Sequence, residues 1–319
     1  MTTLPLSPSS PFYTRLLAWM KERFPFANAL LFFILYLTTA AVTRSSTDTA
    51  MALSLQDLVS ALVTWSFFLV LRVFDEHKDY ELDCRNHPQR VLQSGLITLL
   101  HLRIAGAVAI ASQILWSAWL DKGVGQVTAA WFAMFLWTCL MGKEFFVADW
   151  LNRHLTWYAI SHMLVMPLIV WWLANLANPG TGLTPVLQVM MLLAFISGFC
   201  FEITRKTKGP EEERDTIESY SRIFGTRGSA AVVMALVTAM VANQVWLNTL
   251  LAGDVVVWAA VVLAAFLALG LYQLIRFIRA PSARGRETNE AVVALTMLAG
   301  YAVVIAVVVA SHGLKLMLI

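Results

Sequence analysis

The feature that most constrains the fold of this chain is a series of long apolar segments separated by short charged ones. A helix needs about 20 residues to cross the hydrocarbon core of a bilayer. Hydrophobicity is continuous along each segment rather than alternating, which predicts helices and not the strands of a barrel. We predict an all-α integral membrane protein with nine transmembrane helices, near residues 26–43, 56–74, 103–120, 127–141, 158–177, 185–203, 229–250, 253–275 and 291–311.

Composition supports this class and leaves little room for a soluble domain. Hydrophobic residues make up 59% of the 319 residues and charged residues 13%, and the mean hydropathy is +0.68. A soluble domain of this length could not bury so much apolar surface. We expect two parts: residues 1–25, a cytoplasmic segment with an amphipathic helix in the membrane interface, and residues 26–319, a single nine-helix transmembrane domain.

The basic residues predict how the helices are oriented. If the N-terminus lies inside, twenty of the 23 Lys and Arg residues fall on the inner side, and the outer side keeps Arg44, Lys122 and Lys315. This asymmetry follows the positive-inside rule. It predicts a cytoplasmic N-terminus, an outer C-terminus and acidic loops that face the cytoplasm, in a membrane that we expect to be the inner membrane of a bacterium.

The first acidic cluster is VFDEHKDYELD, residues 73–83, at the end of the second apolar segment. Asp75, Asp79 and Asp83 are four residues apart, and on a continuous helix they would share one face. Like charges at this spacing repel one another. A magnesium ion bridging these carboxylates to a substrate diphosphate would compensate the charge. The alternative is a solvated, charged helix end, and Arg72 could equally bind a diphosphate or pair with Asp75 or Glu76.

The second acidic cluster follows the sixth apolar segment, within residues 201–229. Basic residues alternate with its acids, which are Glu202, Glu211, Glu212, Glu213, Asp215 and Glu218. Such a segment contains groups that could bind both a metal and a phosphate. It could also be a salt-bridged surface loop. Lys143 and Arg153, in another loop on the same predicted side, could hold phosphate or anchor the helices at the membrane surface.

Together the two clusters resemble the UbiA superfamily of intramembrane prenyltransferases. Asp75, Asp79 and Asp83 match that family's first acidic motif, and Arg90-Val-Leu-Gln-Ser-Gly95 matches the stretch that follows it, with valine in place of proline. In the second motif Glu202 stands for the first aspartate, and Lys206 stands where another acid is usual. The topology covers the whole chain, whereas the motifs cover these two loops.

The resemblance implies a UbiA-like helical bundle and magnesium-dependent transfer of a prenyl group from a prenyl diphosphate to an aromatic or lipid-pathway acceptor. Its partners would be these two substrates and membrane lipids, and no nucleic acid. The implied catalytic residues are Asp75, Asp79, Asp83 and Glu202. The same four and Glu212 would bind the metal, and the diphosphate would be bound by Arg72, Lys143, Arg90 and Lys206.

Three alternatives stay open at this point. A polyprenyl-phosphate phosphoribosyltransferase of the same fold would suit the basic residues around Glu202. Lys206 could indicate a family member that has lost activity. A cation transporter or an assembly factor would need no reaction at all, although no ionisable residue lies near the middle of a predicted span, where a cation path would need one.

Overall fold

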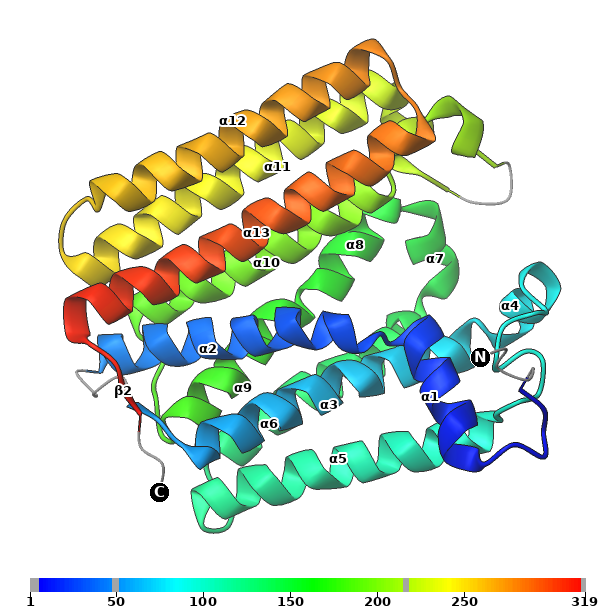
Figure 1. Ribbon diagram of the computed structural model, residues 1–319, viewed down its shortest axis with the longest axis horizontal. Coiled ribbons are helices and arrows are strands. Elements are labelled where there is room, and N and C mark those ends of the chain that lie inside the picture. The colour runs from blue at the N-terminus through cyan, green and yellow to red at the C-terminus, as the bar shows by residue number, and fades with distance from the viewer. Residues whose placement is uncertain (1–5, 48–51, 215–217, 317–319) are drawn as a thin grey trace, which may run out of the picture.

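The computed structural model describes residues 6–47, 52–214 and 218–316, and within them nearly all regular structure is helical (Figure 1). The two strands, β1 (Ala52–Leu53) and β2 (Lys315–Leu316), pair in parallel. The helices are α1 (Phe12–Arg23), α2 (Ala29–Ser46), α3 (Leu55–Lys78), α4 (Tyr80–Asn86), α5 (Leu99–Asp121), α6 (Gln126–Gly142), α7 (Ala148–Arg153), α8 (Leu155–Met163), α9 (Val165–Ala177), α10 (Pro185–Arg205), α11 (Tyr220–Ala252), α12 (Val257–Arg279) and α13 (Ala283–His312). Three 3₁₀ turns, η1 (Phe26–Asn28), η2 (Glu144–Phe146) and η3 (Pro210–Glu212), connect some of them.

The predicted all-α membrane fold is confirmed. Eight helical segments of the described chain are long and apolar enough to cross a membrane, counting η1 with α2 and α8 with α9. The fourth predicted span corresponds to α6, an apolar helix of 17 residues that is shorter than the others. The count of nine crossings and the side on which each loop lies stay predictions.

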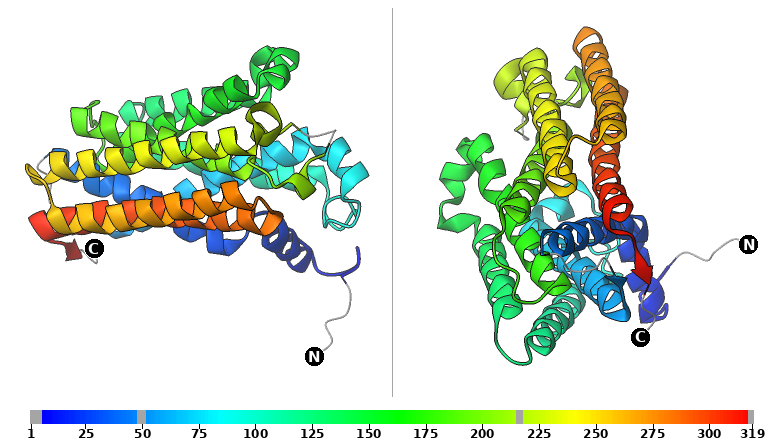
Figure 2. Two further views of the ribbon diagram at one scale, coloured as in Figure 1. Left: turned by 90° about the horizontal axis from the view of Figure 1, so that it is seen from above. Right: turned by 90° about the vertical axis from the view of Figure 1, so that its left-hand side faces the viewer.

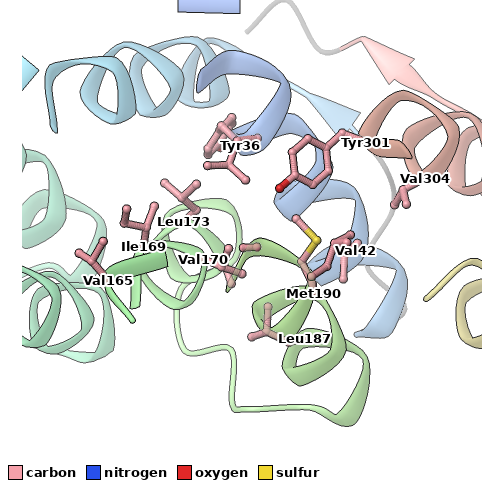
Figure 3. Packing of buried hydrophobic residues seen from close by; sticks show 14 of the residues in the cluster. Tyr36, Val42, Val165, Ile169, Val170, Leu173, Leu187, Met190, Tyr301 and Val304 are labelled. Carbon is pink, nitrogen blue, oxygen red and sulfur yellow. The ribbon is translucent and has the colours of Figure 1, made fainter. Parts of the chain in front are cut away.

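The long helices run along one common direction, as the two further views show (Figure 2). Their packed core lies where α2, α9, α10 and α13 meet, and Tyr36, Ile169, Met190 and Tyr301 are fully or almost fully buried there (Figure 3). Side chains in such a core are close-packed, so the helix ends are held in fixed positions. The segments after α3 and after α10 lie at the same end of the bundle (Figure 1).

Two breaks in the helices have a clear local cause. The fifth span divides at Leu164 into α8 and α9, because Pro167 lacks an N–H and its ring conflicts with the carbonyl one turn earlier. Near the start of α11, Gly225 has φ 70° and ψ 161°, a conformation that disfavours residues with a side chain. The five residues before it therefore form a separate turn at the charged end.

The acidic segment 73–83 is not one continuous helix. The helix α3 ends at Lys78, Asp79 has φ −94° and ψ 4°, and α4 begins at Tyr80. Repulsion between carboxylates one turn apart weakens a helix at this place. The predicted single row of three aspartates is therefore divided between two helices.

The helix α1 occupies the predicted amphipathic segment. Its Trp19 is buried in a small cluster with Phe24, Leu92 and Ile97. Arg15 donates a hydrogen bond to the carbonyl of Leu96, with 2.8 Å between the atoms. This helix thus packs on the segment that follows α4, close to the first acidic cluster.

Candidate active site

The two acidic segments contribute to one cavity of about 320 Å³ between α3, α8, α9 and α10. Asp75 enters it from the last turn of α3, and Glu202 enters it from the last turn of α10. Lys78 and Arg205 bring positive charge to the same wall, and Phe68, Phe74, Tyr158 and His162 contribute aromatic rings. The cavity thus combines carboxylates, cations and an apolar lining, and we refer to it below as the acidic cavity.

An apolar groove lies next to the acidic cavity. It has a volume of about 360 Å³ and shares Phe68 and Met166 with the acidic cavity. Its other walls are apolar residues of α2, α10 and α13, among them Leu31, Phe201 and Met297. A ligand with a charged head and a hydrocarbon tail would have suitable surroundings for both parts.

The carboxylate of Glu202 is neutralised by its own helix end. Arg205 Nη2 lies 2.8 Å from Oε2, and Lys206 Nζ lies 2.9 Å from Oε1. The Lys206 ammonium also lies over the ring of Tyr158, 5.1 Å from its centroid. The two cations next to Glu202 therefore make this wall suited to binding an anion.

Asp75 and Asp79 differ from Glu202 because they form no close ion pairs with basic side chains. The Asp75 side chain is 59% exposed, and the nearest Arg72 nitrogen is 3.9 Å away. No basic side chain of the described residues lies within ion-pair distance of Asp79. Partial removal from water raises the pKa of Asp79, Lys78 opposes this rise, and the nearby Asp83 carboxylate adds to it. Both carboxylates remain available to a ligand.

The third aspartate of the row binds arginines instead. Asp83 Oδ2 lies 2.8 Å from Arg90 Nη1 and 3.3 Å from Arg23 Nη2. The segment that holds Arg90 turns at Gly95, whose φ of +81° favours glycine. Asp83 and Arg90, predicted to bind metal and diphosphate, thus form an ion pair with each other and do not line the acidic cavity.

Arg72 forms the internal pair that the sequence offered as an alternative. It contacts Glu76, whose side chain is fully buried, and Arg23 Nε lies 2.6 Å from the same Glu76 oxygen. A buried carboxylate needs such partners. Glu76 therefore connects α1 to α3 behind the acidic cavity, and Arg72 and Arg23 hold the end of α3 in place.

A second cluster, next to the acidic cavity, was not predicted. Lys78 forms an ion pair with Glu144 and donates a hydrogen bond of 2.8 Å to the Tyr158 hydroxyl. Glu144 belongs to a turn in which three consecutive residues have positive φ, at 49°, 52° and 61°. Each of these positive-φ conformations costs on the order of 1 kcal/mol for a residue with a side chain. The turn directs Glu144 towards Lys78, which fixes the lysine at the wall of the cavity.

Four further predicted residues do not line the acidic cavity. Asp79 and Lys206 directly follow the lining residues Lys78 and Arg205 in the sequence. Glu212 lies in η3 and pairs with Arg286 Nε at 2.7 Å. Lys143 follows α6 and lines a separate cavity on the other side of Phe74. Asp215 of the second cluster is outside the described residues.

The arrangement fits one magnesium ion better than a cluster of metals. No group of three or more His, Cys, Asp or Glu side chains in the described residues lies close enough to hold a metal by itself. Magnesium commonly uses one or two carboxylates and completes its coordination with water and substrate phosphate. Asp75 and Asp79 are suitable donors for such a complex, whereas the carboxylate of Glu202 already has two cationic partners.

The residues that sequence reasoning missed carried weak signals. Lys78 is three residues after Asp75, and Arg205 is three residues after Glu202, so each basic residue follows an acidic one by about one helical turn. Glu144 and Tyr158 offered no signal of this kind, because the chain brings them together through an unusual left-handed turn.

Sequence comparisons assign the chain to no family, because no protein-family description matches it and no curated protein matches it significantly. Its fold does have a solved counterpart. The chain superposes on a digeranylgeranylglyceryl phosphate synthase studied in membranes, with a TM-score of 0.64 and 14% sequence identity. The match covers 94% of this chain and 99% of the synthase. At this identity the comparison shows a shared fold, so the helical bundle is similar to that of this synthase.

Proposed function

We propose that this protein transfers a prenyl group from a prenyl diphosphate, in a magnesium-dependent reaction, to an aromatic or lipid-pathway acceptor within the membrane. The observation that carries the proposal is that the acidic cavity and the apolar groove are neighbours and share Phe68 and Met166 in their linings. The ligand that matches both is an amphiphile with a diphosphate head and a hydrocarbon tail. The shared fold with a prenyl-transferring synthase is consistent with this chemistry.

The chain's own residues would bind and orient the donor. The prenyl tail would lie along α2, α10 and α13, and the diphosphate would lie between the ends of α3 and α10. Lys78, Arg205 and Lys206 would donate hydrogen bonds to its oxygens. When bound at Asp75 and Asp79, magnesium would neutralise charge on the leaving diphosphate.

Bond cleavage between the prenyl carbon and the diphosphate oxygen leaves negative charge on the diphosphate and positive charge on the allyl group. Fixed cations in a site shielded from water stabilise the first charge as it develops. The faces of Phe68 and Phe74, which line the cavity, can stabilise the second. The acceptor then forms the new bond to the prenyl carbon and loses a proton.

The test is ligand-induced stabilisation of the purified protein in detergent, with and without magnesium. The ligands are prenyl diphosphates of several lengths and phosphoribosyl diphosphate. A ligand that binds the folded state raises the melting temperature by mass action. We expect magnesium-dependent stabilisation by a prenyl diphosphate that is lost in Asp75→Asn and kept in Asp149→Asn, whose exposed acid lies outside the cavity.

The other outcomes separate the alternatives. Stabilisation by phosphoribosyl diphosphate alone would replace the prenyl donor with a sugar donor. No response to any diphosphate, from a protein that unfolds cooperatively, would reject a diphosphate-dependent enzyme. Product analysis with the stabilising donor and candidate acceptors would then identify the acceptor.

A further inference from the structure

A second cavity, of about 550 Å³, lies between α3, α5 and α6. It shares Phe74, Lys78 and Gly142 with the acidic cavity. Its lining differs in charge, because it contains His77, Lys78, Arg103 and Lys143, and none of the described carboxylates. We call it the basic cavity. Apart from Lys78, which lines both cavities, none of its basic residues has a part in the proposed prenyl transfer.

Arg103 is held in the basic cavity by a chain of hydrogen bonds. His77 Nδ1 lies 2.8 Å from the carbonyl oxygen of Val73, to which it can donate. The other ring nitrogen, Nε2, then accepts a hydrogen bond from Arg103 Nε at 3.1 Å. This contact uses the inner nitrogen of the guanidinium and leaves both terminal nitrogens for a ligand. A guanidinium in this state is prepared for a bidentate contact with a phosphate.

Lys143 supplies a second cation without a protein counter-charge. Across the described residues, neither Arg103 nor Lys143 lies within ion-pair distance of a carboxylate. Lys78, by contrast, is neutralised by Glu144. Two unbalanced cations at the edge of an apolar bundle attract an anion more strongly than they would in open water. The basic cavity therefore favours a ligand with net negative charge.

The rest of the basic cavity is apolar, and one of its lining residues, Ala107, is exposed on the surface of the bundle. Val73, Ala107, Ile110 and Cys139 line it. Gly106 also lines it. On the neighbouring surface of α5, Ile104 is 56% exposed and Val108 is 65% exposed. In a membrane protein such an apolar face contacts lipid, so an acyl chain can reach the cavity from the bilayer.

We infer that the basic cavity binds a membrane phospholipid whose headgroup has a net negative charge. Arg103 and Lys143 contact its phosphate, and one acyl chain lies along Gly106, Ala107 and Ile110. Charge complementarity selects an anionic headgroup over a zwitterionic one, whose own cation would meet the two basic side chains. The bound lipid packs against α3 one turn from Asp75, and it stabilises the end of the helix that carries the acidic cavity.

The first measurement is the amount of lipid that the purified full chain retains, by native mass spectrometry, from nanodiscs of phosphatidylcholine with or without phosphatidylglycerol. We expect selective retention of phosphatidylglycerol and a melting temperature roughly 3–5 °C above that in phosphatidylcholine. The double variant Arg103→Gln/Lys143→Gln is expected to weaken lipid retention by about tenfold or more. This is the effect expected when at least one charge-assisted contact to the lipid phosphate is lost.

A matched control variant distinguishes a specific lipid site from diffuse electrostatic attraction of anionic lipids to the protein. Arg85→Gln/Arg153→Gln removes the same charge from exposed residues that do not line the basic cavity, and its retention should be unchanged. Equal losses in the two double variants would overturn the proposal in favour of diffuse attraction to anionic membranes. Equal retention of both lipids by the unchanged protein would overturn it as well.

A third measurement tests whether the ligand of the basic cavity is a lipid or free phosphate. Inorganic phosphate added in phosphatidylcholine nanodiscs should not raise the melting temperature, and a full rise would show a phosphate site rather than a lipid site. If the double variant does not fold, Lys143→Gln alone gives the answer, because the Lys143 side chain forms no hydrogen bond or ion pair with the residues that the structure describes. None of these measurements uses a diphosphate substrate, so the result is independent of the proposed function.

Discussion

The two acidic segments have similar compositions but very different ion pairs. In the first, Asp75 and Asp79 are largely free of basic partners, and Asp83 is paired with two arginines. In the second, Glu202 is paired with Arg205 and Lys206, and Glu212 is paired with Arg286. The density of acids therefore does not identify the residues that could bind a metal. The absence of a nearby basic partner does so more directly.

The comparison assigns different tasks to the two ends of the acidic cavity. The end of α3 presents carboxylates and suits a cation. The end of α10 presents guanidinium and ammonium groups around one carboxylate and suits the phosphate oxygens directly. Under the proposed function, the lysine at position 206, where the resemblance led us to expect an acid, would replace part of the charge that a second metal would supply. The separate roles of the two helix ends, in binding the cation and in binding the phosphate, can be tested with single substitutions.

The largest effect is expected for Asp75→Asn. The change keeps the size of the side chain and removes the charge that would hold magnesium against the leaving diphosphate. We expect turnover to fall by about 10²- to 10³-fold, as when other groups that stabilise a transition state are removed. Steady-state rates in detergent measure it, with Asp149→Asn as the control. Near-normal turnover in Asp75→Asn would show that the first segment does not bind the metal.

A smaller effect is expected for Lys206→Gln, which tests the other end of the cavity. Loss of a charge-assisted hydrogen bond to the diphosphate should raise the KM for the donor by roughly tenfold. The neighbouring Lys208→Gln should leave the KM unchanged, because the Lys208 side chain, unlike that of Lys206, contacts neither Glu202 nor Tyr158, which line the cavity. If Lys206→Asp instead raised activity above that of the unchanged protein, the lysine would be a defect in a metal site and not a phosphate ligand.

The sequence predicted the fold and the location of the candidate site better than the ion pairs that its residues form. Continuous apolar segments located most helices to within about four residues, because a membrane span depends on local composition, but α11 and α13 begin nine and eight residues before their predicted spans. The two clusters indicated helix ends that lie close together in the structure, with Asp75 and Glu202 in one cavity. The sequence could not show which charges neutralise each other, because Arg23 meets Asp83 and Arg286 meets Glu212 across long stretches of chain.

Asp79 provides a prediction for pH. Burial and the neighbouring Asp83 raise its pKa, so its proton persists to a higher pH than that of an ordinary aspartate, and protons compete with magnesium. We expect magnesium affinity, measured by calorimetry with donor present, to fall several-fold as the pH is lowered through this raised value. Asp83→Asn removes a repelling charge and frees two arginines, so it should move the fall to lower pH. An unchanged pH profile in Asp83→Asn would show that Asp79 does not control this step.

The smallest effect is expected for Glu212→Gln, which breaks the ion pair with Arg286 at the edge of the second segment. A partly exposed pair contributes about 0.2–1 kcal/mol, so the melting temperature should fall by about 1–3 °C. Glu287→Gln is the matched control, because its carboxylate is 69% exposed and lies 3.7 Å from the same arginine. Donor affinity and magnesium affinity should stay the same in both variants. A tenfold loss of magnesium affinity in Glu212→Gln would place a metal ligand in the second segment, and the two segments would then no longer have separate tasks.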